Sequence, residues 1–370
     1  MVTVQSLTTL VSRRTAPAER VALSRRDELV TCALGTWMLI GLYLDGWAHR
    51  NRDLHDSITT PWHGVFYGGY ICFATWILWV VLRRLRDGHS GLRAVPIGYG
   101  VGLLGVATFT VGGVGDQIWH LTLGVEQDIN AFQSPTHWLL AIGMFLMLSS
   151  PLRAAWSTPG TTTPRLKEFA PTLWSLVLTM GIYFFAYNYM SFFIGDSPTI
   201  DAAKFTASLG PNVSPDLAFS LDERLRILGL TMILLTSVGM VAAILFAQRR
   251  WKLPVGSVTA VFFITANADN AIWEYRHGWV VVAALVGGVV GDWYVQRFDP
   301  SPGNLTAWRC FPVAVLVPMW LTYYLILFTG YEMNWPAEMW TGSIITAVLN
   351  CTLLTFLMRP FDNPVPGGDR

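Results

Sequence analysis

Long apolar runs separated by short polar stretches recur along almost the whole chain. Each run has about 20 residues, enough for a helix to cross the roughly 30 Å hydrocarbon core of a bilayer. We therefore expect ten transmembrane helices, near residues 29–48, 62–82, 94–120, 136–152, 169–190, 225–247, 255–273, 278–296, 309–329 and 338–358. The pattern predicts an all-α fold, a polytopic membrane helical bundle.

The composition also indicates an integral membrane protein. Hydrophobic residues make up 52% and charged residues 13% of the 370, and the mean hydropathy is +0.42, whereas soluble domains contain about 25% charged residues. A net charge of +1 gives no indication of nucleic-acid binding. The four cysteines lie in or beside apolar runs without CxxC spacing, which favours packing roles over disulfides or metal ligands. No HExxH, GxSxG, phosphate-binding glycine loop or CxxCH motif is present.

The basic residues of the short loops predict the orientation of the bundle. Alternate short loops carry clusters of Lys and Arg, and the positive-inside rule places those loops in the cytoplasm. The N-terminal arm, residues 1–28, and the tail, residues 361–370, fall on the same side. Both termini of this cell-membrane protein are therefore predicted to be cytoplasmic. The basic residues of these loops are Arg83, Arg84, Arg86, Arg93, Arg153, Arg165, Lys167, Arg249, Arg250, Lys252, Arg297, Arg309 and Arg359.

An Asp/His unit occurs twice, at the outer ends of the first four spans. Each unit reads Asp-x3-His, a polar connection and then Thr/Ser-Pro-x-His. Residues four apart share a helix face, so the carboxylate and the first imidazole point the same way. The proline suits the first turn of a helix, which places the second histidine at the start of the returning helix. The six residues are Asp45, His49 and His63 in the first unit and Asp116, His120 and His137 in the second.

Each unit thus offers two imidazoles and one carboxylate at the tip of a helical hairpin, a donor set that suits copper, zinc or iron. A single Asp-x3-His is more often a helix cap or an interfacial hydrogen bond, but its repetition favours metal binding. Asp45 and Asp116 lie 71 residues apart. We therefore interpret residues 29–152 as a duplicated two-hairpin module and expect the two tips to meet in one cluster that binds one or two metals.

More polar residues are expected at the same outer level. The remaining six spans, residues 153–360, include a long external loop, residues 191–224, which could cover the site. A carboxylate inside a span usually faces a partner or a cavity. The candidates for positions around the ligands are Glu126, Asp269, Glu274 and His277.

The first unit resembles the intramembrane metal motif of the C subunit of copper-dependent membrane monooxygenases, the particulate methane and ammonia oxidisers. In that family an Asp-x3-His precedes a second histidine after a spacer similar to the 13 residues here. The resemblance covers about 20 residues and implies that Asp45, His49 and His63 bind copper near the outer side of the membrane, where the metal takes part in oxygen activation. The second unit has a spacer of 16 residues and shares only the composition.

Several functions stay open at this point. The leading hypothesis is a copper-dependent oxidase or hydroxylase that acts on an apolar small molecule. One alternative is a zinc-dependent intramembrane hydrolase, similar to the alkaline ceramidases, in which a carboxylate serves as the base. Others are a metal-handling or transport protein and a purely structural subunit. The expected partners are the lipid bilayer and either copies of this chain or other subunits.

Reporter fusions test the predicted orientation. A reporter fused after Arg86, Arg250 or Arg359 should read cytoplasmic and one fused near Asp201 should read external, because the positive-inside rule assigns these positions to opposite sides. Pairing a reporter that is active only inside the cell with one that is active only outside measures each position twice. A cytoplasmic reading at Asp201 would contradict the common outer face.

Overall fold

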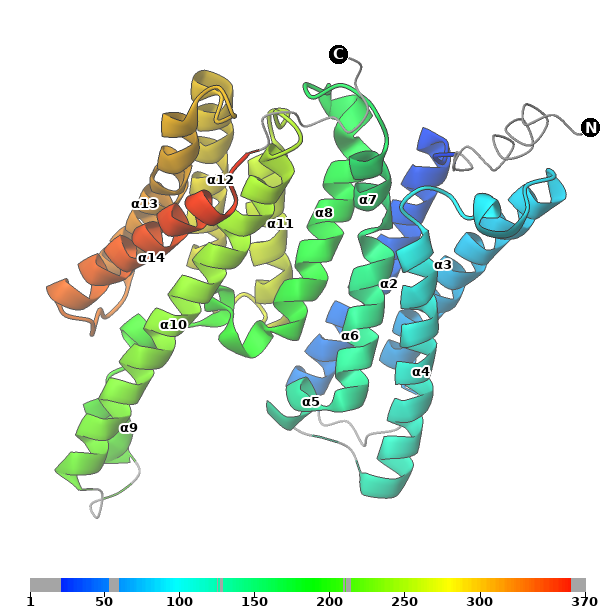
Figure 1. The fold of residues 1–370 in the computed structure, drawn as a ribbon. Helices are drawn as coiled ribbons and strands as arrows, with labels where there is room; N and C mark the ends of the chain where they lie inside the picture. The colour runs from blue at the N-terminus through cyan, green and yellow to red at the C-terminus, as the bar shows by residue number, and fades with distance from the viewer. Residues whose placement is uncertain are drawn as a thin grey trace, which may run out of the picture.

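The chain is helical throughout the part that the structure describes (Figure 1). The computed structural model describes residues 21–52, 60–124, 126, 129–208, 210 and 214–360, and within these ranges no strand forms. This confirms the predicted all-α bundle. Most of the expected N-terminal arm, residues 1–20, and the expected tail, residues 361–370, lie outside the described residues.

Each expected span is helical in the structure. The long helices are α2 (Arg25–Asn51), α3 (Pro61–Arg86), α4 (Gly100–Leu123), α6 (Pro135–Leu148), α8 (Leu166–Ala186), α10 (Pro215–Gln248), α11 (Ser257–Ile272), α12 (Trp279–Phe298), α13 (Leu305–Gly330) and α14 (Ala337–Leu357). The short helices are α5 (Ile129–Gln133), α7 (Ser150–Ser157), α9 (Ala202–Ser208) and the 3-10 helices η1 (Gly91–Ala94), η2 (Asn188–Met190), η3 (Phe192–Ile194) and η4 (Ser197–Thr199).

The number of membrane-spanning helices differs from the ten expected. Eight described helices are long and apolar enough to cross a membrane, and a ninth span results if α6 and α7 count as one. These two helices meet at a 41° bend beside Ser149, where Pro151 occupies the first turn of α7. The expected span at 255–273 becomes α11, which has only 16 residues and is therefore about 24 Å long. Its last turns carry Asn267, Asp269 and Asn270, which interrupt the apolar run.

Two clusters of buried side chains fill the bundle. One lies mainly among α2, α3, α4 and α6 and includes Met38, Phe73 and Phe109, and the other lies among α8 and α10–α14 and includes Phe192 and Trp320. Helices α8 and α11 contribute side chains to both clusters, and α8 runs between the two groups of helices in Figure 1. The division into modules 29–152 and 153–360 stays a prediction.

The connections that carry the basic residues meet at one end of the bundle. Hydrogen bonds and ion pairs at this end join Arg25 Nε to the Lys167 carbonyl (3.2 Å), the Lys252 amide to the Thr162 carbonyl (2.7 Å) and Lys252 to Asp299 (3.3 Å). At the other end, Asn51 donates to the Ile272 carbonyl (2.9 Å) and Trp47 to Glu274 (3.3 Å). The two Asp/His units belong to this second end, opposite the basic connections, and the cytoplasmic placement of both termini stays a prediction.

Glycines bring the helices of each hairpin into close contact. A Cβ atom at Gly41 would lie 2.6 Å from the Phe66 backbone, and one at Gly69 would lie 2.7 Å from the Met38 backbone. Helix α4 approaches α6 in the same way at Gly112, where a Cβ would lie 2.9 Å from the α6 backbone. Small residues of this kind allow the close van der Waals packing that associates helices in lipid. The contacts fix the register in which each hairpin closes.

Adding a methyl group at such a contact should destabilise the bundle. We expect Gly41→Ala to lower the free energy of unfolding by about 1–3 kcal/mol, because the Phe66 backbone has to move away. The matched control is Gly342→Ala in α14, where a Cβ meets nothing within 4 Å, and the higher helix propensity of Ala should leave stability equal or slightly raised. Thermal unfolding in one detergent compares the variants, and equal shifts would contradict the close contact.

Candidate metal centre

The first hairpin brings together the first triad, which consists of Asp45, His49 and His63. Asp45 and His49 lie in the last two turns of α2, and His63 is the third residue of α3. Thr60 caps α3 by accepting a hydrogen bond from the His63 amide (3.3 Å), and its hydroxyl is also 2.8 Å from Nδ1 of the His63 ring. The cap therefore fixes the imidazole and leaves Nε2 directed at the carboxylate.

The ligand atoms of the first triad converge. One atom from each of its three residues lies within 4.8 Å of the other two. Oδ2 of Asp45 is 3.8 Å from Nε2 of His49 and 3.6 Å from Nε2 of His63. Four ligands at about 2.0–2.1 Å in a tetrahedron would be about 3.3–3.4 Å apart, so this spacing is close to that around a metal ion.

The second hairpin forms the second triad, which consists of Asp116, His120 and His137. As in the first triad, the carboxylate and one histidine lie at the end of a helix, here α4, and the other histidine lies at the start of the next, here α6. Oδ1 of Asp116 lies 3.7 Å from Nε2 of His120 and 3.1 Å from Nε2 of His137. The ligand atoms again lie within 4.8 Å of one another. Thr136 donates a hydrogen bond to the same carboxylate oxygen at 2.8 Å. These distances confirm that each repeated unit brings its three members to one point.

The hydrogen bonds of His137 determine which nitrogen faces the site. Its Nδ1 atom is 2.6 Å from the Ala131 carbonyl oxygen, which can only accept, so Nδ1 carries a proton. In the neutral ring, Nε2 then has a lone pair that points at the Asp116 oxygen 3.1 Å away. Two acceptors at this distance repel each other. A positive charge, either a metal ion or a second ring proton, must therefore lie between them.

Each carboxylate also lies near the start of a helix. The hydroxyl that binds Asp116 comes from Thr136, the second residue of α6, and Asp45 contacts His63 in the first turn of α3. The unsatisfied amides and the dipole of a helix N-terminus favour negative charge by about 0.3–1 kcal/mol, and by more when the geometry is partly buried. This arrangement offsets part of the cost of burying Asp45 and Asp116, which are 9% and 4% exposed.

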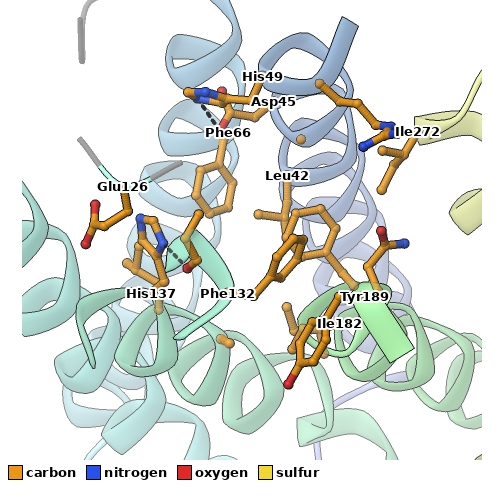
Figure 2. A pocket seen from close by; sticks show the side chains of 18 of the residues that line it. Leu42, Asp45, His49, Phe66, Glu126, Phe132, His137, Ile182, Tyr189 and Ile272 are labelled. Atoms are coloured by element: carbon orange, nitrogen blue, oxygen red, sulfur yellow. Dashed lines mark hydrogen bonds and ion pairs between the residues drawn. The ribbon is translucent and has the colours of Figure 1, made fainter. Parts of the chain in front are cut away.

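Both triads line one cavity of about 620 Å³. Figure 2 shows Asp45 and His49 on one side of it and His137 on another, with apolar side chains between and beyond them. The expectation that the two triads form one metal cluster stays a prediction. The other lining residues are mainly apolar or aromatic and include Phe66, Tyr67, Phe132, Leu140, Met144, Ile182, Phe185, Ile272 and Trp273.

Of the four candidates for positions around the ligands, Glu126 is the one that reaches a triad. Its Oε2 atom lies 3.2 Å from Nε2 of His120, and the residue lines the cavity. Asp269 lies in a separate buried network, where it accepts hydrogen bonds from Tyr43 (3.0 Å) and Ser191 (2.7 Å). The proposed site position of Glu126 thus has direct geometric support.

The two remaining candidates lie in the connection between α11 and α12. Glu274 accepts a hydrogen bond from Nε1 of Trp47 at 3.3 Å. His277 lies 4.0 Å from Asp196 and packs edge-on against Trp279. Neither these residues nor Asp269 are among the described residues that line the cavity.

Three features of the site had not been recognised in the sequence. Thr60 and Thr136 orient a histidine and a carboxylate. Thr60 is the threonine of the Thr/Ser-Pro-x-His pattern, which marks a helix cap, whereas Thr136 occupies the variable position of that pattern and has no signal in it. The Ala131 carbonyl is a backbone group and has no signal in the residue types. The cavity wall from α8 consists of ordinary apolar residues.

No protein-family model, curated protein or solved structure matches this chain. The geometry of the two triads therefore provides the main evidence on function. The local resemblance of the first triad to the copper-dependent monooxygenases stays an expectation.

The stability of the α11–α12 connection should depend on pH through His277. Burial lowers the pKa of His277 from its usual value of 6.5, so the unfolded chain binds a proton more readily than the folded chain. The contribution of His277 to the free energy of unfolding is fully present above about pH 6.5 and is lost as the pH falls through the lowered pKa. We expect the loss of Tm between pH 8 and pH 5 to be smaller in His277→Asn than in the wild type. An equal or larger loss would contradict this role.

Proposed function

We propose that this chain is a membrane metalloprotein that binds one metal ion at each triad, and that the metal is copper in an oxidase or hydroxylase acting on an apolar substrate. Eight described helices can cross a membrane, and two Asp/His groups can hold a metal ion. The observation that carries the proposal is the convergence, in each triad, of one carboxylate oxygen and two imidazole nitrogens within 4.8 Å of one another.

The donors of the second triad fit a metal ion. The buried Nε2 atom of His120 and both carboxylate oxygens of Glu126 have no hydrogen-bond partner among the described residues. The Nε2 atom of His120 and the Oε2 atom of Glu126 lie 3.2 Å apart. An unpartnered buried polar atom costs about 1–3 kcal/mol, so a cation bound beside them would offset this penalty. Two imidazoles with one or two carboxylates suit copper, zinc and iron alike, and the resemblance of the first triad favours copper.

The surrounding residues would bind and orient the substrate. Bound copper would supply the redox chemistry that oxygen activation requires. The cavity has a volume within the range typical of small-molecule sites, and Phe66, Phe132 and Ile182 provide an apolar wall against which an apolar substrate would pack. Thr60 and the Ala131 carbonyl hold two imidazoles in fixed orientations, which keeps the donor atoms in place while a substrate enters.

A zinc-dependent hydrolase is the second candidate, because the donors are nitrogen and oxygen atoms only. In that case Glu126, close to His120 but outside the triad, is placed to accept a proton from water. Metal content and dependence on oxygen separate the two candidates. A metal-handling or transport function is less well supported, because the donors gather at one end of the bundle.

Elemental analysis of the purified protein tests the proposal. We expect about two metal ions per chain in the wild type, predominantly copper, with one lost in His120→Ala or Asp116→Ala and the other lost in His63→Ala. These variants should insert and express like the wild type, because water can fill the space that an imidazole leaves at the membrane edge. The control is His89→Ala, a histidine at the opposite end of the bundle.

The outcomes are distinct. Zinc in place of copper would favour the hydrolase, and loss of both ions in every ligand variant would indicate one shared cluster. Full metal occupancy in both His120→Ala and Asp116→Ala would mean that the second triad is a structural hydrogen-bond motif, and the metalloprotein proposal would fail.

A further inference from the structure

The second triad has a fourth donor that the paired Asp-x3-His and Pro-x-His pattern does not contain. Glu126 lies in the connection between α4 and α5 and returns toward the end of α4. Its Oε2 atom is 3.2 Å from Nε2 of His120, which is 3.7 Å from Oδ1 of Asp116, which is 3.1 Å from Nε2 of His137. The Glu126–His120 distance is thus close to the roughly 3.3–3.4 Å edge of a tetrahedral metal site, while the mutual convergence within 4.8 Å is that of Asp116, His120 and His137.

Two further observations indicate that the Glu126 carboxylate is directed at a cation. Both of its oxygens are buried and have no hydrogen-bond partner among the described residues, although the side chain comes from a surface connection. Figure 2 also shows the Glu126 and His137 side chains on the same side of the cavity. A solvated loop carboxylate would instead point its oxygens at water.

The backbone beside Glu126 makes this return possible. Helix α4 ends at Gly124, which has φ of 90° and ψ of 179°. Only glycine adopts this conformation readily, because a Cβ atom would clash with the backbone. The backbone conformation therefore depends on glycine at this position, and Glu126, two residues later, contacts His120.

We propose that Glu126 is the fourth ligand of the second triad and makes it selective for a divalent ion. The inference rests on the proposed metal binding at this triad. Two neutral imidazoles and two carboxylates carry a charge of −2, which a divalent ion neutralises. A monovalent ion such as Cu⁺ leaves a net negative charge in a cavity at the membrane edge, where an unbalanced charge is costly. Cu⁺ also prefers softer sulfur ligands to carboxylate oxygen.

Competition with chelators tests this role in the full-length protein. The background is His63→Ala, which disables the first triad and leaves the second triad to be measured alone. In this background we expect Glu126→Gln, which keeps the shape and removes the charge, to weaken Zn²⁺ binding at least tenfold. Cu⁺ affinity under a reducing, oxygen-free atmosphere should change less than about threefold, so the preference for the divalent ion should fall.

Two more variants sharpen the result. Gly124→Ala leaves the carboxylate in the sequence but strains the turn that positions it, and it should weaken Zn²⁺ binding in the same direction. Glu332→Gln is the matched control, because this carboxylate is exposed at the same end of the bundle and pairs with Lys204. Thermal unfolding of each variant verifies that the bundle remains folded.

The possible outcomes distinguish a failure of the Glu126 proposal from a failure of metal binding at the second triad. If His120→Ala abolishes Zn²⁺ binding while Glu126→Gln changes it less than threefold, the triad binds metal without Glu126 and the inference is wrong. If Glu126→Gln weakens Zn²⁺ and Cu⁺ equally, Glu126 is a ligand without selectivity and the charge argument is overturned. If His120→Ala also retains Zn²⁺, the proposed function itself fails.

Discussion

The structure of the site depends on the meeting of a carboxylate from the end of one helix with an imidazole from the start of the next. A buried carboxylate is expensive unless it is paired and hydrogen-bonded. Asp116 meets this requirement through the Thr136 hydroxyl (2.8 Å) and, once a metal ion or a ring proton lies between them, through His137 (3.1 Å); both residues lie in the first turn of α6. The glycine contacts that set the register of the hairpin are therefore also what allows the carboxylate to be buried, because a shift along the helix axis would separate it from both partners.

The remaining helices complete the wall of the cavity that the two hairpin tips share. Helix α8 and the end of α11 provide Phe185 and Ile272, and these close the side of the cavity that faces the second half of the bundle. The buried Asp269 stabilises this side of the cavity. It accepts hydrogen bonds from Tyr43 of α2 and from Ser191 in the segment after α8, and so connects both to α11. Thus a carboxylate that does not line the cavity still determines its shape.

The parts of the site that follow from local sequence were predictable. Helix periodicity places Asp45 and His49 on one face, and the Pro-x-His pattern places His63 at a helix start, as observed. The bend at Ser149 lies inside the expected span 136–152, and Pro151, in the first turn of α7, is its signal in the residue types. The partners of Asp269 are distant in sequence, at Tyr43 and Ser191, so only tertiary packing reveals that this carboxylate belongs to a separate network.

The tautomer of His137 links metal binding to protonation. Because its Nδ1 proton is committed to the Ala131 carbonyl, the space between Nε2 and Asp116 can be filled either by a metal ion or by a second ring proton. A proton there would form an ion pair that replaces most of the attraction of the metal and keeps α4 and α6 together. Metal binding must then release this proton, so affinity rises with pH while the fold changes little. The same carbonyl that orients the ligand therefore allows the site to exist without its metal.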